Sequence, residues 1–382
     1  MPLEDAWREA VARVLSARGW PELSDTGRLG PLVMRLSQAY NYSESVPHEL
    51  LPARLAFSFA RDVPKGAACV RELVACGRLG FPEGKPLRVL DLGAGLGATT
   101  WGVARALEAA GQRGEIDATW IDTDAAALGV AADLATARGE TPVAVRARTV
   151  AGGVSAPRGQ KYDLVLLGQV LSELDATMPA RDRVEKHADL VRTLLEGSVL
   201  DEGSLVVVEP ALRDRTRHLH AVRDMLLETP SVTVFAPCLH REACPALKNE
   251  GDWCHEDLAV DLPSWLVPIA RAAGLRWQGL TFSYLVLRKD GASLKGRGYP
   301  WRVISGAIVT KGKRELFLCG KEQAEPAARV RVQRLDRHAS EQNRAWEGLA
   351  RGDLVALKPP PALPLGKVLP ETQVDVEEGW EY

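Results

Sequence analysis

The sequence has few of the features that mark secreted and membrane proteins. Its 382 residues contain only 6 cysteines, too sparse for a disulfide scaffold, so clustered thiols are better candidates for metal ligands. No stretch approaches about 18 uninterrupted apolar residues, so no membrane span is predicted. The start of the chain, Met1 to Asp5, lacks the basic and apolar parts of a secretory or import leader. We therefore expect a soluble, cytoplasmic protein.

Charge is nearly balanced over the whole chain but not along it. The formal net charge is -2, yet residues 276–358 hold 17 Lys and Arg against 8 Asp and Glu, whereas residues 200–275 hold 7 against 12. A basic module on a neutral chain is typical of a nucleic-acid contact. A solvated face rich in Lys and Arg is the alternative that this count leaves open.

The hydrophobic pattern changes its period along the chain. Residues 1–85 place apolar residues at helical spacing, which predicts an N-terminal helical region. In residues 86–290, helical segments alternate with short apolar runs at 87–92, 118–122, 142–146, 162–167, 204–209 and 282–287. Such strands, alternating with helices, require a parallel sheet covered on both faces. We predict an α/β fold with a doubly wound, Rossmann-like sheet.

Three further segments depart from this pattern. Residues 230–258 carry three cysteines and interrupt the α/β alternation, so we interpret them as an insertion that binds metal. Residues 291–358 turn to strand-like patterns and predict a small, basic, β-rich module that contains Cys319. The proline-rich and then acidic residues 359–382 are predicted to form a flexible tail.

A glycine-rich turn follows the first predicted strand. It reads Asp91-Leu-Gly93-Ala-Gly95-Leu-Gly97 and precedes a helix, whose positive N-terminus and close backbone approach suit a nucleotide cofactor. Asp91 is placed to contact a cofactor amine or a bound water, and Asp122, which closes the second strand, to accept ribose hydroxyls. The pattern resembles the class I S-adenosylmethionine-dependent methyltransferases, which implies that cofactor. A nicotinamide cofactor is the alternative.

The turn after the fourth strand is the expected place of the methyl acceptor. Methyl transfer needs a near-linear approach of acceptor, methyl and sulfur, so catalysis is mainly positioning. Gln169, Ser172 and Glu173 are the candidates for acceptor contact, and the alternative is that Ser172 and Glu173 cap the next helix. The turn lacks both the Asn/Asp-Pro-Pro-aromatic signature for exocyclic amines and a Pro-Cys nucleophile for cytosine C5.

Four cysteines form a second group of candidate site residues. Cys238, Cys244 and Cys254 fall in the short insertion, and Cys319 lies in the basic module. Their spacing matches neither paired C-x-x-C zinc knuckles nor the compact cysteine motif of radical enzymes. Four thiolates can hold tetrahedral zinc or a cubane iron-sulfur cluster, and the pattern leaves both open.

These cysteines belong to an ordered set of short motifs that resembles a known family. The motifs are Cys238-Leu-His240, Cys244-Pro245, Asp252-Trp253-Cys254-His255, Phe282-Ser283-Tyr284-Leu285 and Leu316-Phe317-Leu318-Cys319. They are similar to the methyltransferase-like family of small ribosomal subunit proteins, which has bacterial members and mitochondrial assembly factors. The resemblance covers roughly residues 50–357.

The resemblance implies a class I methyltransferase fold, a four-iron, four-sulfur cluster and contact with small-subunit ribosomal RNA. Its implied cluster ligands are Cys238, Cys244, Cys254 and Cys319, and its implied S-adenosylmethionine contacts are Asp91, Gly93, Gly95, Gly97 and Asp122. The chain departs from the family after the fifth strand, where Glu209-Pro-Ala-Leu-Arg213 replaces Glu-Pro-Gly-Thr-Pro. Leu239 also replaces a proline after Cys238.

Three functions are consistent with these patterns. The first is a methyltransferase that acts on small-subunit ribosomal RNA and carries a structural cluster. The second is a non-catalytic RNA-binding assembly factor, and the third is a zinc-containing small-molecule methyltransferase. Cations near Trp301, in 295–302 and 311–314, favour RNA, since cations neutralise phosphates and aromatic faces stack on bases. The alternative for Trp301 is a place in the core of the module.

Overall fold

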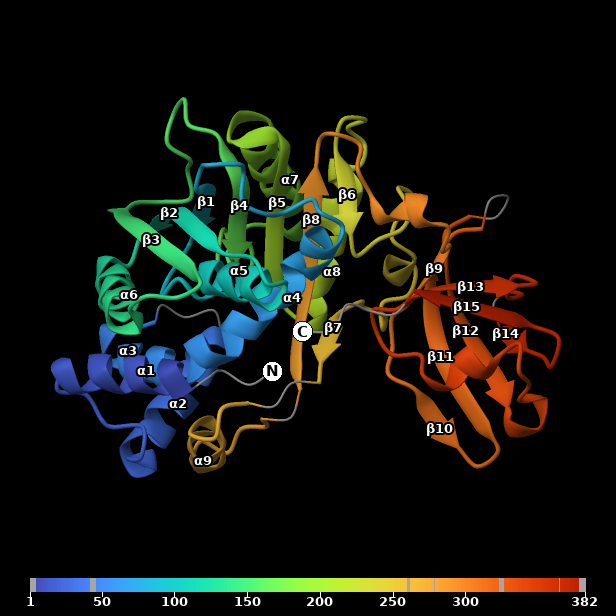
Figure 1. Cartoon of the computed structure of the whole chain (residues 1–382), viewed down its shortest axis with the longest axis horizontal. Coiled ribbons are helices and arrows are strands. Elements are labelled where there is room, and N and C mark those ends of the chain that lie inside the picture. Colours follow the sequence, from blue (N-terminus) through green and yellow to red (C-terminus); the bar gives the residue numbers. More distant parts are fainter. Residues whose placement is uncertain are drawn as a thin grey trace.

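Two sheets lie side by side and divide the strands between them (Figure 1). The computed structural model describes residues 5–41, 46–259, 262–277, 279–322, 326–363 and 365–377. The larger sheet carries helices on both faces, and the smaller sheet forms a β-rich module beside it. The predicted fold class is therefore confirmed.

The N-terminal region is helical, as its periodicity predicts. Its segments are α1 (Asp5–Ala17), α2 (Thr26–Asn41), the 3-10 turn η1 (His48–Leu50), α3 (Leu51–Ala53), the π-helical segment η2 (Arg54–Phe59) and α4 (Ala60–Ala75). Trp7 of α1 packs against Phe59 and Trp101, with ring centroids 5.2 and 4.9 Å apart. These helices share one hydrophobic core with the larger sheet, so they cap that domain instead of forming a separate one.

The larger sheet is mostly parallel. Its strands are β1 (Leu87–Leu92), β2 (Gly114–Asp122), β3 (Val143–Ala151), β4 (Tyr162–Gly168), β5 (Val199–Pro210), β6 (Thr233–Ala236), β7 (Glu256–Leu258) and β8 (Leu280–Arg288). They follow the order β3-β2-β1-β4-β5-β8-β6, with β7 also paired to β8. Strands β1 to β5 pair in parallel, whereas β8 is antiparallel to its neighbours. The carboxyl ends of the parallel strands therefore meet at one edge, where ligands usually bind.

Helices cover both faces of this sheet because successive strand residues point to opposite sides. The helices after the N-terminal cap are α5 (Ala98–Ala109), α6 (Ala125–Arg138), α7 (Ala180–Gly197), α8 (Arg213–Leu226) and α9 (Leu266–Ala272). Leu87 and Val89 of β1 join the core that contains α4, α5 and α6, whereas Leu90 and Leu92 join the core that contains α7 and α8. In the described ranges, no helix has the length and apolarity that crossing a bilayer requires.

The predicted insertion, residues 230–258, is corrected at both of its ends. Strand β6 pairs with residues 286–288 of β8, and β7 pairs with residues 280–282 of the same strand. Only the irregular stretch between these strands, residues 237–255, departs from the sheet, and it contains the 3-10 turn η3 (Pro245–Leu247). We call residues 237–255 the cysteine loop. Its two ends are therefore fixed along one strand.

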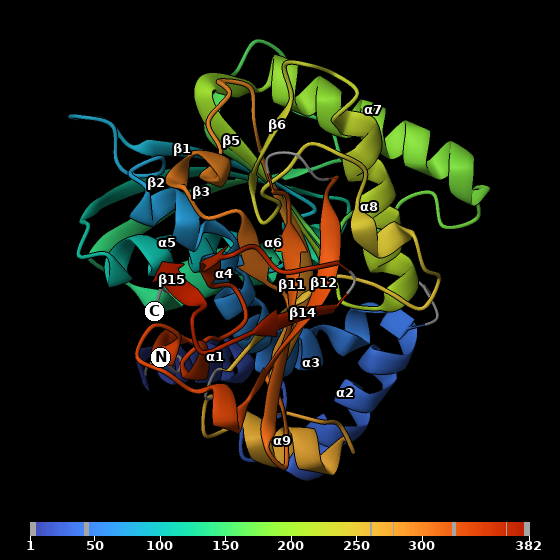
Figure 2. The ribbon, with the colours of Figure 1, turned by 90° about the vertical axis from the view of Figure 1, so that its right-hand side faces the viewer.

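The β-rich module, which faces the viewer in Figure 2, has its own hydrophobic core. Its strands are β9 (Trp301–Val303), β10 (Ile308–Thr310), β11 (Lys313–Gly320), β12 (Ala328–Leu335), β13 (Leu354–Lys358), β14 (Leu365–Val368) and β15 (Gln373–Glu377). They follow the order β14-β12-β11-β9-β13-β15, with β10 paired to β11. Trp301 and Trp346 lie at the centre of this core, so the core alternative for Trp301 is the one observed.

The prediction of a flexible tail from Pro359 is wrong for residues 365–368 and 373–377. Strand β14 pairs in parallel with β12, and β15 pairs antiparallel with β13. Val368 and Val374 are buried in the core of the module. Alternation of valine with polar residues is a strand pattern, and it outweighs the acidic composition of this stretch. Residues 378–382 lie outside the described part of the chain.

Candidate functional site

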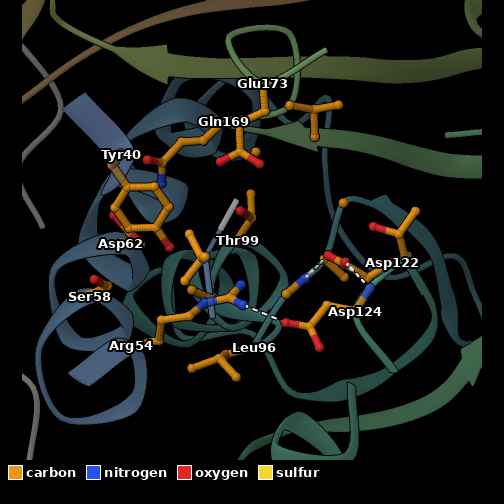
Figure 3. Close-up of a pocket in the computed structure, with 18 of the residues that line it drawn as sticks. Tyr40, Arg54, Ser58, Asp62, Leu96, Thr99, Asp122, Asp124, Gln169 and Glu173 are labelled. Atoms are coloured by element: carbon orange, nitrogen blue, oxygen red, sulfur yellow. Dashed lines mark hydrogen bonds and ion pairs between the residues drawn. The ribbon is translucent and has the colours of Figure 1, made fainter. Parts of the chain in front are cut away.

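A cavity of about 680 Å³ opens at the carboxyl ends of β1, β2 and β4 (Figure 3). The glycine turn forms its floor, and the N-terminal helices supply the opposite wall. Its polar lining side chains include Tyr40, Arg54, Ser58, Asp62, Thr99, Asp122, Asp124, Gln169, Glu173 and Arg215. Residues from the N-terminal cap and from the sheet are thus brought to one place.

The glycine turn is shaped by backbone conformations that only glycine adopts easily. Gly93, Gly95 and Gly97 have φ angles of 70°, 53° and 76°. A Cβ atom at Gly97 would also lie 2.7 Å from the ring of buried Trp120, which would force that ring to move. The amide of Gly93 donates to the carbonyl of Ile121 at 2.8 Å, so the turn is tied to the end of β2. Gly93 and Gly95 line the cavity, whereas Gly97 caps α5.

Asp122 lines the cavity and organises its neighbours. Its Oδ2 accepts the amide of Gly95 at 2.8 Å, and its Oδ1 accepts the amide of Asp124 at 2.8 Å. Asp124 in turn caps α6, because its Oδ1 accepts the amide of Ala127 at 2.9 Å. A carboxylate oxygen has more than one acceptor position, so Asp122 can still accept hydrogen bonds from a ligand in the cavity.

Arg54 is the cation at the centre of the cavity wall. It comes from the π-helical segment η2, and its Nη1 donates to Oδ2 of Asp124 at 2.9 Å. Its guanidinium also faces the glycine turn, since a Cβ atom on Gly95 would lie 2.9 Å from Arg54 Nη2. Tyr40 stands beside Arg54, and burial raises the pKa of its hydroxyl to about 12. The cavity therefore presents a fixed positive charge next to the turn.

Asp91 lies behind the turn and does not line the cavity. Its Oδ2 accepts the hydroxyl of Thr100 at 2.7 Å, and that hydroxyl oxygen accepts Nε1 of Trp120 at 3.0 Å. Its Oδ1 is buried and has no hydrogen-bond partner within the described ranges. Burial raises the pKa of this carboxyl to about 7. Of the predicted cofactor contacts, Asp91 and Gly97 are thus the two that do not line the cavity.

The three candidate acceptor contacts occupy different positions in the turn after β4. Gln169, with a left-handed φ of 62°, and Glu173 line the cavity. Ser172 is buried, and its amide and that of Leu171 donate to Glu209 at 3.1 and 2.8 Å. Burial raises the pKa of the Glu209 carboxyl to about 7. Ser172 therefore shapes this turn, while Gln169 and Glu173 reach the space where an acceptor would lie.

The four predicted metal ligands gather between the cysteine loop and β11. Burial, together with a smaller contribution from Cys238, raises the pKa of the Cys244 and Cys254 thiols to about 12. Burial also raises the pKa of Cys319, with further contributions from the other three cysteines. Over the described residues, no three His, Cys, Asp or Glu side chains are arranged to hold a metal ion. The four thiols therefore lie near one another, but they are not arranged to bind a single metal ion.

Arginines from α8 hold the cysteine loop in place. Nη1 of Arg217 donates to the carbonyls of Ala246, Asn249 and Asp252 at 3.0, 2.7 and 2.7 Å. Arg223 donates to the carbonyls of Glu242 and His240. Because these guanidinium groups replace the backbone partners that a sheet would supply, the loop has a defined path without regular secondary structure.

Most Lys and Arg side chains of the basic module form ion pairs or hydrogen bonds within the protein. Arg302 pairs with Glu72 of α4, Arg329 with Asp252 and Lys321 with Glu242. Within the module, a further set of ion pairs joins Lys313 and Arg331 to Glu315 and Arg334 to Glu347. Trp301 is buried and donates its Nε1 hydrogen to Glu322 at 2.8 Å, so it is not placed to stack on bases. The charge count therefore overstates the free basic surface.

The sequence patterns did not identify Arg54, Tyr40 or Asp124 as site residues. Arg54 and Tyr40 sit on helices whose apolar periodicity describes only packing. Their approach to the glycine turn depends on how the N-terminal cap docks, which spacing does not reveal. Asp124 carried a usable signal, because an Asp directly before an alanine-rich helix is a typical N-cap.

Comparisons with known proteins give one family match. The family described as mitochondrial small ribosomal subunit Rsm22 matches residues 54–350, which is more than half of the chain. No curated protein matches the sequence. The matched range begins at Arg54 and includes the glycine turn, the cysteine loop and Cys319.

Solved structures show weaker likenesses. The plantazolicin methyltransferase BpumL in complex with SAH is 11% identical, with a TM-score of 0.36 over 70% of this chain and 98% of that chain. A putative class I S-adenosylmethionine-dependent methyltransferase from Listeria monocytogenes is 12% identical, with a TM-score of 0.34 over 76% and 88%. The [4+2]-cyclase SpnF is 19% identical, with a TM-score of 0.30 over 58% and 80%. These TM-scores are too low to support an argument about function.

Proposed function

The chain belongs to the Rsm22 family of mitochondrial small ribosomal subunit proteins, and from this membership we propose that it binds S-adenosylmethionine and methylates small-subunit ribosomal RNA. The observation that carries the proposal is the cavity at the glycine turn, where Arg54 and Asp122 face one space. A carboxyl-end cavity with a glycine turn is where α/β sheets bind nucleotide cofactors.

The cavity residues fit the charges of that cofactor. Arg54 is the proposed partner of the methionine carboxylate, because a guanidinium binds a carboxylate with two parallel hydrogen bonds. Asp122 is proposed to accept the ribose hydroxyls, and the glycine turn of Gly93 and Gly95 lets the backbone approach the ligand. Gly97 is proposed to keep the start of α5 in place. Asp91, through its unpartnered Oδ1, is proposed to act through a bound water.

The acceptor side of the cavity is formed by the turn after β4. S-adenosylmethionine supplies an electrophilic methyl group when bound. Gln169 and Glu173 are proposed to orient the acceptor, because both line the cavity on a turn that Ser172 and Glu209 hold rigid. Positioning of this kind supplies most of the catalysis that a methyl transfer requires.

For the cysteines we propose a structural four-iron, four-sulfur cluster held by Cys238, Cys244, Cys254 and Cys319. Four cysteine thiolates are the usual ligand set of such a cluster. All four thiols lie close enough to influence one another, since Cys238, Cys244 and Cys254 all raise the pKa of Cys319. Zinc is the alternative metal, and the ultraviolet and visible absorbance of anaerobically purified protein separates the two. A brown protein with iron and acid-labile sulfide supports the cluster, and a colourless zinc protein overturns it.

Two other functions compete with this proposal. A non-catalytic assembly factor would bind small-subunit RNA and keep the cofactor cavity for stability. It gains support from the departure at residues 211–213, where Ala-Leu-Arg replaces Gly-Thr-Pro directly after Glu209 and Pro210, close to the turn that Glu209 supports. A zinc-containing small-molecule methyltransferase would need no RNA, and the family membership argues against it.

Methyl incorporation distinguishes these functions. Purified protein and methyl-labelled S-adenosylmethionine would be incubated with small subunits from cells that lack the protein. The proposal expects label in the RNA, reduced at least tenfold by Glu173→Gln combined with Gln169→Ala. Binding of subunits without label supports the assembly factor. Label in a small molecule, with no binding of subunits, supports the third function.

A further inference from the structure

We propose that Arg223 is a built-in counter-charge for the four-cysteine site, placed to hold an anionic, thiolate-ligated iron-sulfur group and to make its reduction easier. This inference rests on the proposed cluster and goes beyond it by assigning a positioning role to a residue outside the ligand set.

Arg223 lies in the interior of the molecule, on the side of α8 that faces the cysteine loop. Its side chain is 0% exposed and contacts the stretch between the ligands Cys238 and Cys244. Nη2 donates to the carbonyl of His240 at 2.6 Å, and Nη1 donates to the carbonyl of Glu242 at 2.7 Å. The guanidinium is therefore fixed among the residues that separate two thiols.

The neighbour of Arg223 ties the same loop to α8. Asp224 forms an ion pair with Arg223, and its carboxylate accepts the amide of Cys244, at 2.8 Å to Oδ2. Asp224 is 23% exposed whereas Arg223 is fully buried, so water screens the acid more than the base.

Several buried nitrogens around the loop have no hydrogen-bond partner among the described residues. They are Nε of Arg223, Nδ1 of His220, Nε1 of Trp253 and Nδ1 of His255. His220 already accepts the amide of Cys254 through Nε2 at 3.2 Å, so its free nitrogen bears the hydrogen. Native proteins rarely leave several donors unsatisfied in one place. A group rich in sulfur acceptors among them would supply what the protein lacks.

Asp224, the ion-pair partner of buried Arg223, is partly exposed to water, so a second negative charge nearby would further lower the cost of burying this cation. Four thiolates around an iron-sulfur core carry net negative charge, and one-electron reduction adds a further unit. Arg223 therefore stabilises the assembled site, and it stabilises the reduced form more than the oxidised form. Net charge and hydrogen bonds to sulfur are established determinants of cluster potential.

The test compares arginine variants in the full-length, anaerobically reconstituted protein. Arg223→Met removes the charge and the carbonyl contacts, whereas Arg223→Lys keeps the charge. The matched control is Arg217→Met, which removes contacts to the same loop from an arginine of the same helix. Iron and acid-labile sulfide per chain are measured, and the midpoint potential is followed by electron paramagnetic resonance during titration with dithionite.

We expect Arg223→Met to lower iron and sulfide at least threefold and to shift the midpoint potential to more negative values. Arg223→Lys should load as the wild type does, and the cluster that Arg217→Met binds should keep the wild-type midpoint potential. If Arg223→Met fails to fold, Asp224→Asn gives an independent test, because removing this acid should shift the potential to more positive values. Equal loading and potential in Arg223→Met and Arg217→Met, or an unchanged potential in Asp224→Asn, would overturn the counter-charge. Wild-type protein without iron and sulfide would instead overturn the cluster itself, and the counter-charge with it.

Discussion

The amide of Gly95 donates a 2.8 Å hydrogen bond to Oδ2 of Asp122, and so joins the turn after β1 to the end of β2. The other oxygen of the same carboxylate accepts the amide of Asp124, whose side chain pairs with Arg54. One chain of contacts therefore fixes the glycine turn, the start of α6 and the N-terminal cap around the cavity. A binding site that is shaped before its ligand arrives loses less entropy on binding.

Gly97→Ala should reduce the free energy of unfolding by about 2–4 kcal/mol, because a left-handed backbone and a contact with the Trp120 ring both oppose a side chain. Gly111→Ala is the matched control, since Gly111 has φ of 75° but nothing within 4 Å of an added Cβ. Its cost should be about 1–2 kcal/mol, from backbone strain alone. Urea unfolding measures both values, and equal costs would show that the Trp120 contact is unimportant.

Asp91 should make the protein less stable as pH rises. Its carboxyl has a pKa of about 7 in the folded state against an ordinary value of 3.8, so the folded state keeps a proton that the unfolded state loses. The stability that this proton provides is complete below the unfolded pKa and is lost as pH rises to the folded pKa. Asp91→Asn removes this dependence.

Thermal unfolding between pH 4.5 and 7.5, a window chosen from these two pKa values, tests this assignment. The melting temperature of Asp91→Asn relative to wild type should increase steadily across the window. Glu209 titrates in both proteins and cancels in the difference. A constant difference would mean that Asp91 is already ionised in the folded protein.

The buried pair of Glu72 and Arg302 should lock the β-rich module to the α/β domain. Glu72 also accepts the hydroxyl of Tyr284 at 2.9 Å, and Arg302 donates to the carbonyl of Pro237 at 3.1 Å. Arg302→Met should cost about 3–5 kcal/mol, because it leaves a buried carboxylate unpaired.

A double-mutant cycle with Glu72→Gln checks this interpretation by chemical denaturation. The double variant should be clearly more stable than the sum of the single costs implies. Lys358 and Asp375 form an exposed control pair, for which the coupling should be about 0–1 kcal/mol. Additive costs for Glu72 and Arg302 would argue against the lock.

Sequence patterns predicted the central strands of the larger sheet well because β1, β4 and β5 are largely buried and therefore mostly apolar. Strand β1 spans Leu87–Leu92, as its apolar run indicates. The prediction of a flexible tail was wrong because it rested on the composition of the stretch, whereas the alternation around Val374 indicates a strand. The basic module was overinterpreted for a different reason, since a charge count does not show that Arg302 and Arg329 find partners far away in sequence. The position of Arg54 depends on tertiary docking, which no local pattern contains.

The strand β14, found where a flexible tail was predicted, leads to a further prediction. Val368→Ala should cost about 1–3 kcal/mol, because the side chain is fully buried in the core of the module. Leu365→Ala on the same strand, where the side chain is 43% exposed, should change stability by less than about 0.5 kcal/mol. Urea unfolding of the two variants measures the difference. A flexible tail would make both substitutions neutral.

The most direct test of the central claim is a calorimetric titration of the full-length protein with S-adenosylmethionine. Wild type should bind one cofactor, and Asp122→Asn should bind at least tenfold more weakly, about 1.4 kcal/mol or more. Asp117→Asn, which changes an exposed carboxylate on the same strand β2, should bind as the wild type does. Failure of the wild type to bind, or equal affinity in Asp122→Asn, would contradict the assignment of the cavity as the cofactor site.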